Sequence, residues 1–167
     1  MTNNNMQNKG MKIIDKDELI YLAGFIDGDG SLIAQMVRRH DYKFKYQIKC
    51  TVQITQLKKR RHFLEKIQES IGYGIIRDRG TISDYVLVEP KCVYWLLKQL
   101  SPFLRLKKKQ ADLIIRIIEQ LTSSKNSAVL FVQLCRLTDQ VALLNDSKSR
   151  TITAEVVETT LRELGLI

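Results

Sequence analysis

Two aspartates, Asp27 and Asp29, alternate with glycines in the stretch AGFIDGDGS at residues 23–31. The apolar run LIYLAGF that leads into them is typical of a helix, so both carboxylates would lie where that helix ends. The last carbonyls of a helix are unpaired and carry about half a negative charge, which disfavours carboxylates nearby. A departure from local preference of this kind is often a sign of a functional site.

This stretch has three possible interpretations. The first is a glycine-rich turn in which the aspartates accept hydrogen bonds from the neighbouring backbone. The second, a calcium loop of the EF-hand kind, is excluded because Leu32 and Arg38 stand where that loop needs glycine and glutamate. The third is a catalytic site in which the carboxylates and the helix-end carbonyls form an oxygen-rich pocket for Mg²⁺.

The charge of the chain indicates a polyanionic partner. Its 167 residues include 27 Lys and Arg against 18 Asp and Glu, a net charge of +9. Such an excess favours nucleic acid or an anionic membrane surface, with better solubility as the alternative explanation. No apolar run approaches the ~18 residues of a membrane span, and no signal peptide is visible. The cysteines, Cys50, Cys92 and Cys135, are far apart and are expected to be reduced, buried thiols rather than zinc ligands or disulfide partners.

The elements expected to position these residues follow the order α-β-β-α-β-β, and further helices come after them. Two hairpins, each preceded by a helix, predict an α+β fold with one antiparallel sheet and helices packed on a single face. We expect a loose polar tail at 1–12 and a single domain at 13–167. The strands are expected at 31–37, 46–56, 73–79 and 82–88, and the later helices at 59–71, 93–100, 106–121, 128–144 and 153–164.

One face of the predicted sheet is polar but poor in acids. The second strand alternates cleanly, so that Gln47, Lys49 and Gln53 share the face opposite to Ile48 and its apolar neighbours. Amides and cations of this kind read base edges in a major groove, which a β-ribbon fits. We therefore interpret this face as a nucleic-acid surface; the alternative is an ordinary solvated face.

Two further segments carry clustered cations. The run LRLKKKQ at 104–110 places cations at the start of a predicted helix, where the helix dipole disfavours them and bound phosphates would stabilise them. The loop NDSKSRT at 145–151 offers Ser147, Lys148 and Arg150 for contacts to a phosphate backbone.

Other nuclease chemistries fit the sequence poorly. The chain has two histidines, His40 and His62, with no metal-ligand pattern around them. Asp84 together with EPK at 89–91 superficially resembles a PD-(D/E)xK arrangement, but the spacing is too short and Pro90 makes that segment a turn.

The stretch YLAGFIDGDG resembles the LAGLIDADG motif, with Phe25 and Gly28 at positions that are more often leucine and alanine. The similarity continues through QITQLKKRR, IIRDRG, SDY, PFLRLKKKQA and ALLNDSKSR. The chain is therefore similar to the single-motif, homodimeric LAGLIDADG homing endonucleases of the I-Cre type, which algal chloroplast introns encode. This resemblance implies the αββαββα endonuclease fold, a four-stranded antiparallel saddle-like sheet and C-terminal helices.

The resemblance also implies roles for individual residues. Asp29 and the carbonyl of Gly28 would bind the metal, and Asp29, Gln56, Arg60 and Lys107 would form the catalytic set. Asp27 would act as a structural cap. The two-fold interface would be formed by Leu22, Ala23, Gly24 and Asp27. Contacts to DNA would come from Ile33, Gln35, Val37, Arg39, Asp41, Tyr42, Gln47, Lys49, Thr51, Gln53, Arg77, Arg79, Asp84, Val86, Ser147, Lys148 and Arg150.

The implied function is that of a hydrolase: a site-specific endonuclease that makes a double-strand break in a long pseudo-palindromic DNA target at an intron insertion site. The implied cofactor is Mg²⁺, with Mn²⁺ also active and Ca²⁺ supporting binding without efficient cleavage. The implied partners are double-stranded DNA and a second copy of the chain, in the chloroplast, with no membrane and no small-molecule substrate. The alternative is a binding module of the same family, an intron-RNA maturase or a DNA-binding regulator. Retention of the four catalytic residues favours the enzyme.

Overall fold

The computed structural model describes residues 12–145 and 150–167. The tail expected at 1–12 therefore lies, apart from Lys12, outside the described residues. The elements are α1 (Lys16–Asp29), β1 (Gly30–Arg38), β2 (Tyr46–Leu57), the 3-10 turn η1 (Lys58–Arg60), α2 (Arg61–Ile71), β3 (Ile75–Arg79), β4 (Ile82–Leu87), α3 (Pro90–Leu100), α4 (Lys108–Ser124), α5 (Ala128–Leu144) and α6 (Ala154–Glu163).

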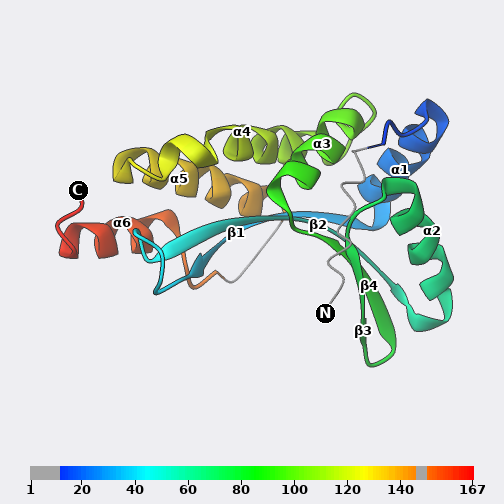
Figure 1. Cartoon of the computed structure of the whole chain (residues 1–167), viewed down its shortest axis with the longest axis horizontal. Helices are drawn as coiled ribbons and strands as arrows, with labels where there is room; N and C mark the ends of the chain where they lie inside the picture. The colour runs from blue at the N-terminus through cyan, green and yellow to red at the C-terminus, as the bar shows by residue number, and fades with distance from the viewer. Residues whose placement is uncertain (1–11, 146–149) are drawn as a thin grey trace, which may run out of the picture.

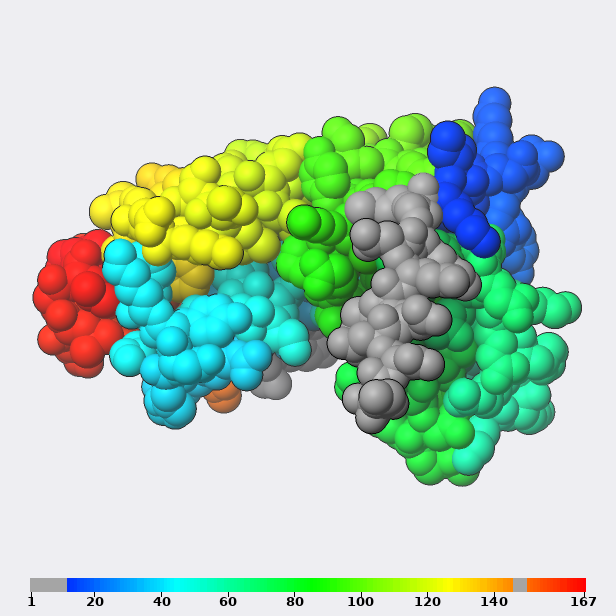
Figure 2. Space-filling model, viewed as in Figure 1, coloured from blue at the N-terminus to red at the C-terminus, as the bar shows by residue number. Residues whose placement is uncertain are grey.

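The four strands form one antiparallel sheet in the order β1-β2-β4-β3, which confirms the predicted α+β class. Figure 1 shows α3, α4 and α5 along one face of the sheet, while the β3–β4 hairpin bends away from the long β1–β2 pair. In the space-filling view of Figure 2, the ends of both hairpins protrude on the side away from these helices. The other face of the sheet is thus left open by these helices.

The alternation of β2 explains why one of its faces meets the helices. Ile48, Cys50, Val52 and Ile54 are each at most 4% exposed, whereas the alternate residues Lys49 and Gln53 are half-buried and Thr51 is 7% exposed. Burial of such apolar side chains contributes about 1.5–3 kcal/mol each and drives the helices onto this face. A single cluster of buried apolar residues extends from Ile14 to Leu161.

Helix α1 begins at a cap and runs directly into the sheet. The carboxylate of Asp15 accepts a hydrogen bond from the backbone N–H of Asp17 at the helix start. At the other end, Gly30 starts β1 without any linker. A Cβ atom at Gly30 would lie 2.8 Å from the Cα of Ile26, so this close turn from helix to strand requires glycine.

The later helices are those predicted, with shifted ends: α2 begins two residues later than expected, after η1, and α4 spans Lys108–Ser124 instead of 106–121. Helix α3 begins at Pro90, three residues before the expected start, because proline is well suited to the first helical position. Among the described residues, none of the helices is long and apolar enough to cross a membrane. All three cysteines are buried and unpaired, as predicted, and burial raises the pKa of the Cys50 thiol to about 12.

Candidate functional site

The end of α1 is the start of a chain of hydrogen bonds that reaches three of the four predicted catalytic residues. The carboxylate Oδ2 of Asp29 accepts from Nε2 of Gln56 at 3.0 Å. The Oε1 of Gln56 accepts in turn from Nη1 of Arg60 at 3.3 Å. Gln56 is only 8% exposed, so its amide is fixed with its donor toward the carboxylate and its acceptor toward the guanidinium.

The fourth predicted catalytic residue, Lys107, meets the same helix end. Its ammonium group donates to the backbone carbonyl of Asp27, one of the last carbonyls of α1. The contact brings a cation to the negative end of a helix, where it is stabilising. The structure therefore gathers side chains from α1, β2, η1 and the start of α4 around one helix terminus.

The two aspartates of the motif have different surroundings. The carboxylate of Asp27 accepts from the backbone N–H of Arg105 at 2.7 Å and from that of Lys107 at 2.9 Å. It therefore caps the start of α4, which has no cap from its own N-cap side chain. Partial burial opposes ionisation, but the N–H groups of Arg105, Lys107 and Leu106 outweigh it and lower the pKa of Asp27. Asp27 is thus a structural cap, and Asp29 is the exposed carboxylate of the pair.

The donor set at this helix end fits a hard divalent cation. Asp29 supplies an exposed carboxylate, and Gly28 supplies one of the last helical carbonyls, which have no partner within the helix. Oxygen donors of this kind are the ligands that Mg²⁺ prefers. Within the described residues no group of three or more His, Cys, Asp and Glu side chains could hold a metal. One chain therefore offers part of a coordination shell.

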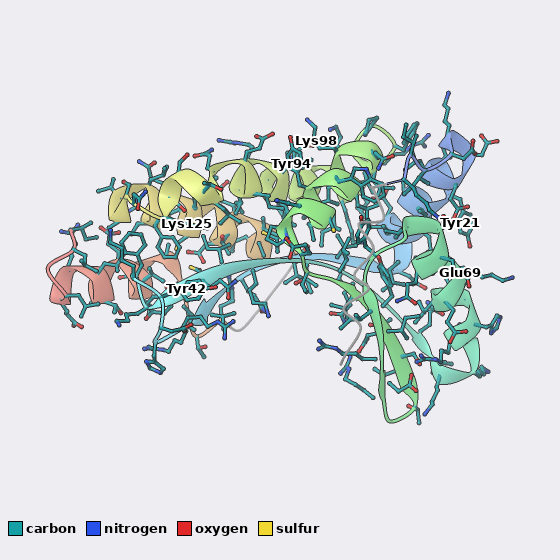
Figure 3. All side chains as sticks on the ribbon, viewed as in Figure 1. Tyr21, Tyr42, Glu69, Tyr94, Lys98 and Lys125 are labelled. Atoms are coloured by element: carbon teal, nitrogen blue, oxygen red, sulfur yellow. The ribbon has the colours of Figure 1, made fainter. Side chains whose placement is uncertain are left out.

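The strand register places the predicted DNA-contacting residues in continuous rows on the open face. Cross-strand partners point to the same side of a sheet. The pairs Gln35–Lys49 and Val37–Gln47 join β1 to β2, and the triple Gln53–Val86–Ile75 extends the face to β3. Ile33, Arg39, Asp41 and Arg77 are likewise half-buried or exposed. Figure 3 shows Tyr42 at the end of the β1–β2 hairpin, whereas Tyr94 and Lys98 lie on the outer side of the helices.

Asp84, which was predicted to contact DNA, has a buried carboxylate whose two oxygens both accept hydrogen bonds from the chain itself. It is only 3% exposed. Its Oδ1 accepts from Gln53 at 3.1 Å and from the hydroxyl of Thr55, and its Oδ2 accepts from Nε of Arg79. The bond from Arg79, outweighing the opposing effect of burial, lowers the pKa of Asp84. Asp84 therefore orients two predicted base-reading side chains, Gln53 and Arg79.

Two other predicted DNA contacts are also less accessible than expected. Thr51 is 7% exposed on the open face. Arg150 pairs with Asp139 at 2.8 Å and donates to the carbonyl of Thr138, and 17% of its side chain is exposed. It connects the segment before α6 to α5 instead of extending into solvent. The predictions for Ser147 and Lys148 fall outside the described residues.

The residues predicted for the dimer interface differ in their exposure. Leu22 and Ala23 are 0% exposed in the single chain, so their side chains belong to its own core. The opposite side of α1 is open: Gly24 is exposed, a Cβ atom there would meet nothing within 4 Å, and Ile20 is 47% exposed. An exposed apolar line with glycines suits close packing against another helix.

One ion-pair cluster near the site was not predicted from the sequence. Asp78 of β3 lies between Arg77 and Arg79 in sequence but points to the other face, where it meets Arg61 and Ser83. The alternation of β3 is the signal that separates Asp78 from its neighbours. Its partners come from distant parts of the chain and could not be read from that alternation.

Comparison with known proteins identifies the family. Residues 22–136 match the family model described as LAGLIDADG endonuclease. The chain is 52% identical over 151 residues to DNA endonuclease I-CreI of Chlamydomonas reinhardtii, covering 90% of this chain and 93% of that protein. It is 39% identical over 152 residues to DNA endonuclease I-CvuI of Chlorella vulgaris, covering 90% and 94%.

Solved structures of homing endonucleases are also similar to this chain. A crystal structure of the homing endonuclease I-CvuI, in complex with an I-CreI target in 2 mM Mg with the DNA not cleaved, matches with a TM-score of 0.88 at 36% identity, covering 91% of this chain and 97% of that one. A second I-CvuI complex, with its own target in 2 mM Ca, has a TM-score of 0.87. The archaeal homing endonuclease I-Vdi141I, at 21% identity and a TM-score of 0.80, shares the fold. With one copy of the motif at the end of α1, this chain belongs to the LAGLIDADG endonuclease family.

Proposed function

We propose that this chain is a homing endonuclease, which makes a metal-dependent double-strand break in a long, pseudo-palindromic DNA target at an intron insertion site. The observation that carries the proposal is the hydrogen-bonded series Arg60–Gln56–Asp29 at the end of α1. This series adjoins the first residues of β1, a strand of the open polar face. A phosphate held at the helix end would thus belong to the duplex that the sheet contacts.

The proposed cofactor is Mg²⁺, held by Asp29 and the carbonyl of Gly28. The remaining ligands would be DNA phosphate oxygens, water and Asp29 of the partner subunit. The bound cation would act as a Lewis acid on the phosphate and lower the pKa of a coordinated water. We expect Mn²⁺ to support cleavage as well, and Ca²⁺ to support binding with little cleavage because it holds a looser oxygen shell.

The protein groups of the site have complementary tasks. Gln56 orients the Asp29 carboxylate through the bond from its Nε2, and Arg60 fixes the amide in that orientation. The exposed guanidinium of Arg60 and the ammonium of Lys107 are placed to stabilise negative charge that develops on the phosphate. Each of these groups acts from a defined position before DNA binds, which is the arrangement that electrostatic catalysis requires.

The proposed assembly is a homodimer joined through the exposed line of α1 that contains Ile20 and Gly24. A two-fold pair of chains would present two sheets to two half-sites, so the target should be close to palindromic. Because the chain resembles homing endonucleases that algal chloroplast introns encode, and its two relatives come from Chlamydomonas reinhardtii and Chlorella vulgaris, we propose the chloroplast as the compartment.

A cleavage assay tests the proposal directly. The purified protein is incubated with Mg²⁺ and a plasmid carrying the intron-free target locus, and linear product is followed over time. We expect one double-strand break in that plasmid and none in a plasmid whose locus is interrupted by the intron. The matched control is Asp29→Asn, which should bind the same target without cutting it. Tight binding by the wild-type protein with no cleavage in Mg²⁺ or Mn²⁺ would favour the non-cleaving binding module.

A further inference from the structure

We propose that Asp78 is a positioning residue, which couples the β3–β4 hairpin to the catalytic Gln56–Arg60 pair and so makes cleavage depend on correct reading by that hairpin. The inference deepens the proposed function and rests on it. Its basis is the position of Asp78, whose carboxylate lies behind a strand of base-reading arginines and contacts the segment next to the catalytic residues.

The contacts of Asp78 converge from three elements. Nη1 of Arg61, the first residue of α2, donates to its Oδ1 at 2.6 Å. The hydroxyl of Ser83 on β4 donates to the same oxygen at 2.7 Å. The ammonium of Lys58 in η1 lies 3.5 Å from Oδ2. One carboxylate thus joins the hairpin to both the 3-10 turn and the helix that follow β2.

The strand register extends the connection to the catalytic glutamine. Gln56 is the cross-strand partner of Ser83, and Ser83 is that of Asp78, so the three residues form one row on the face opposite to the reading face. Arg61 directly follows Arg60, which donates to Gln56. The row of cross-strand partners and the ion pair between Asp78 and Arg61 therefore connect these residues in a ring. The ring runs through Gln56, Ser83, Asp78, Arg61 and Arg60 and returns to Gln56.

A backbone hydrogen bond also joins η1 to the β3–β4 hairpin. The N–H of Lys58 donates to the carbonyl of Thr81, in the turn between β3 and β4, at 2.8 Å. On the other side of the hairpin, Arg79 is held by Asp84. A movement of the hairpin as its arginines meet DNA would therefore shift η1, and with it the guanidinium of Arg60.

The proposed coupling should affect the cleavage rate more than the affinity for DNA. Exposed ion pairs contribute little to stability, so loss of the Asp78 charge should leave the fold and most DNA contacts in place. A small displacement of a catalytic group, in contrast, can lower a rate by about two orders of magnitude. The ring thus predicts an effect on cleavage rate that exceeds the effect on affinity.

The test compares Asp78→Asn with wild type and with Glu65→Gln, which removes the other acidic partner of Arg61 without touching the hairpin. Single-turnover cleavage and the dissociation constant in Ca²⁺ are measured on the matched target. For Asp78→Asn we expect cleavage to slow roughly tenfold or more and affinity to change less than about threefold. Glu65→Gln should behave as wild type. Arg61→Gln should reproduce the effect, and the double variant should be no worse than either single one.

A second measurement is independent of cleavage. Side-chain NMR signals of the Gln56 amide and the Arg60 guanidinium in DNA-free protein should shift in Asp78→Asn and stay in place in Glu65→Gln. Additive effects of Arg61→Gln and Asp78→Asn, or equal losses in rate and affinity, would overturn the coupling. If the wild-type protein fails to cut, the proposed function fails, and unchanged NMR signals in Asp78→Asn would separately refute the ring.

Discussion

The two aspartates of the motif should respond in opposite ways to the same substitution. Asp27 accepts two backbone N–H bonds that cap α4, whereas Asp29 accepts one side-chain bond from Gln56 and is otherwise exposed. Asparagine keeps one carbonyl oxygen at either position. Asp27→Asn therefore loses one capping bond and a charge, while Asp29→Asn keeps its bond and loses the charge alone.

The magnitudes follow from these bonds. Loss of a helix cap costs about 0.5–2 kcal/mol, so Asp27→Asn should destabilise the protein by about 1–2 kcal/mol. For a chain of this size, this corresponds to a melting temperature lower by roughly 2–8 °C. Asp29→Asn removes a negative charge from the negative end of α1 and should stabilise the metal-free protein by a few tenths of a kcal/mol.

The pH dependence of the Asp27 effect has a definite sign. Because the folded-state pKa of Asp27 is lowered, its contribution to stability is fully present above the unfolded-state pKa, near 4, and is lost as pH falls through the folded-state value. The stability difference between wild type and Asp27→Asn should thus be constant near neutral pH and shrink below pH ~4.

The assay combines thermal unfolding at one fixed protein concentration, without metal, with cleavage of the target in Mg²⁺. Fixed concentration matters because a dimer's melting temperature depends on it. We expect Asp27→Asn to melt lower and still cut, and Asp29→Asn to melt at or above wild type and fail to cut. Near-normal cleavage by Asp29→Asn would refute the proposed metal site. A wild-type melting temperature for Asp27→Asn would refute its role as a cap.

Three further outcomes are expected. Gly24→Leu should weaken the dimer in sedimentation without affecting the folded chain, since its side chain would enter open space in a single copy; a dimer of wild-type affinity would exclude this face. Asp84→Asn should relax discrimination at the base pairs that Arg79 reads, by roughly 1–3 kcal/mol where the contact is bidentate, in a binding profile over single-base variants. Lys109→Ala, at an exposed cation of the run at 104–110, should weaken binding to all targets alike and reduce the slope of log affinity against log salt concentration by about one; a change in sequence preference would count against contact with the phosphate backbone.

The sequence predicted the elements because their patterns are local. The alternation of β2 depends only on residues that are neighbours in the chain, and it is present in the structure. The start of α3 differed because a proline can either end one element or begin the next, and its φ angle suits a first helical turn.

The surroundings of the site residues were harder to predict from the sequence than the helices and strands were. Helix α1 is apolar on nearly every side, so its sequence alone could not show which stripe faces its own core, and Leu22 and Ala23, which were predicted for the interface, are buried within the single chain. Strand alternation placed Asp84 on the correct face, but its burial depends on Gln53, Thr55 and Arg79, which converge on it from β2 and β3. The pairing of Arg150 with Asp139 likewise needs α5 and α6 to be packed together.

The motif is short because three of its residues, Asp27, Asp29 and Gly30, have separate structural roles at the same end of α1. Asp27 connects that end to the start of α4, some 80 residues later in the chain. Asp29, two residues on, faces Gln56 on β2, and Gly30 turns the chain directly into the strand that lines the open face. A helix advances about 1.5 Å per residue, so the backbones of Asp27, Asp29 and Gly30 lie within a few ångströms of one another. A one-residue insertion between Asp27 and Asp29 would rotate the Asp29 carboxylate by about 100° away from Gln56 while leaving Asp27 in place, and it should abolish cleavage before it abolishes folding.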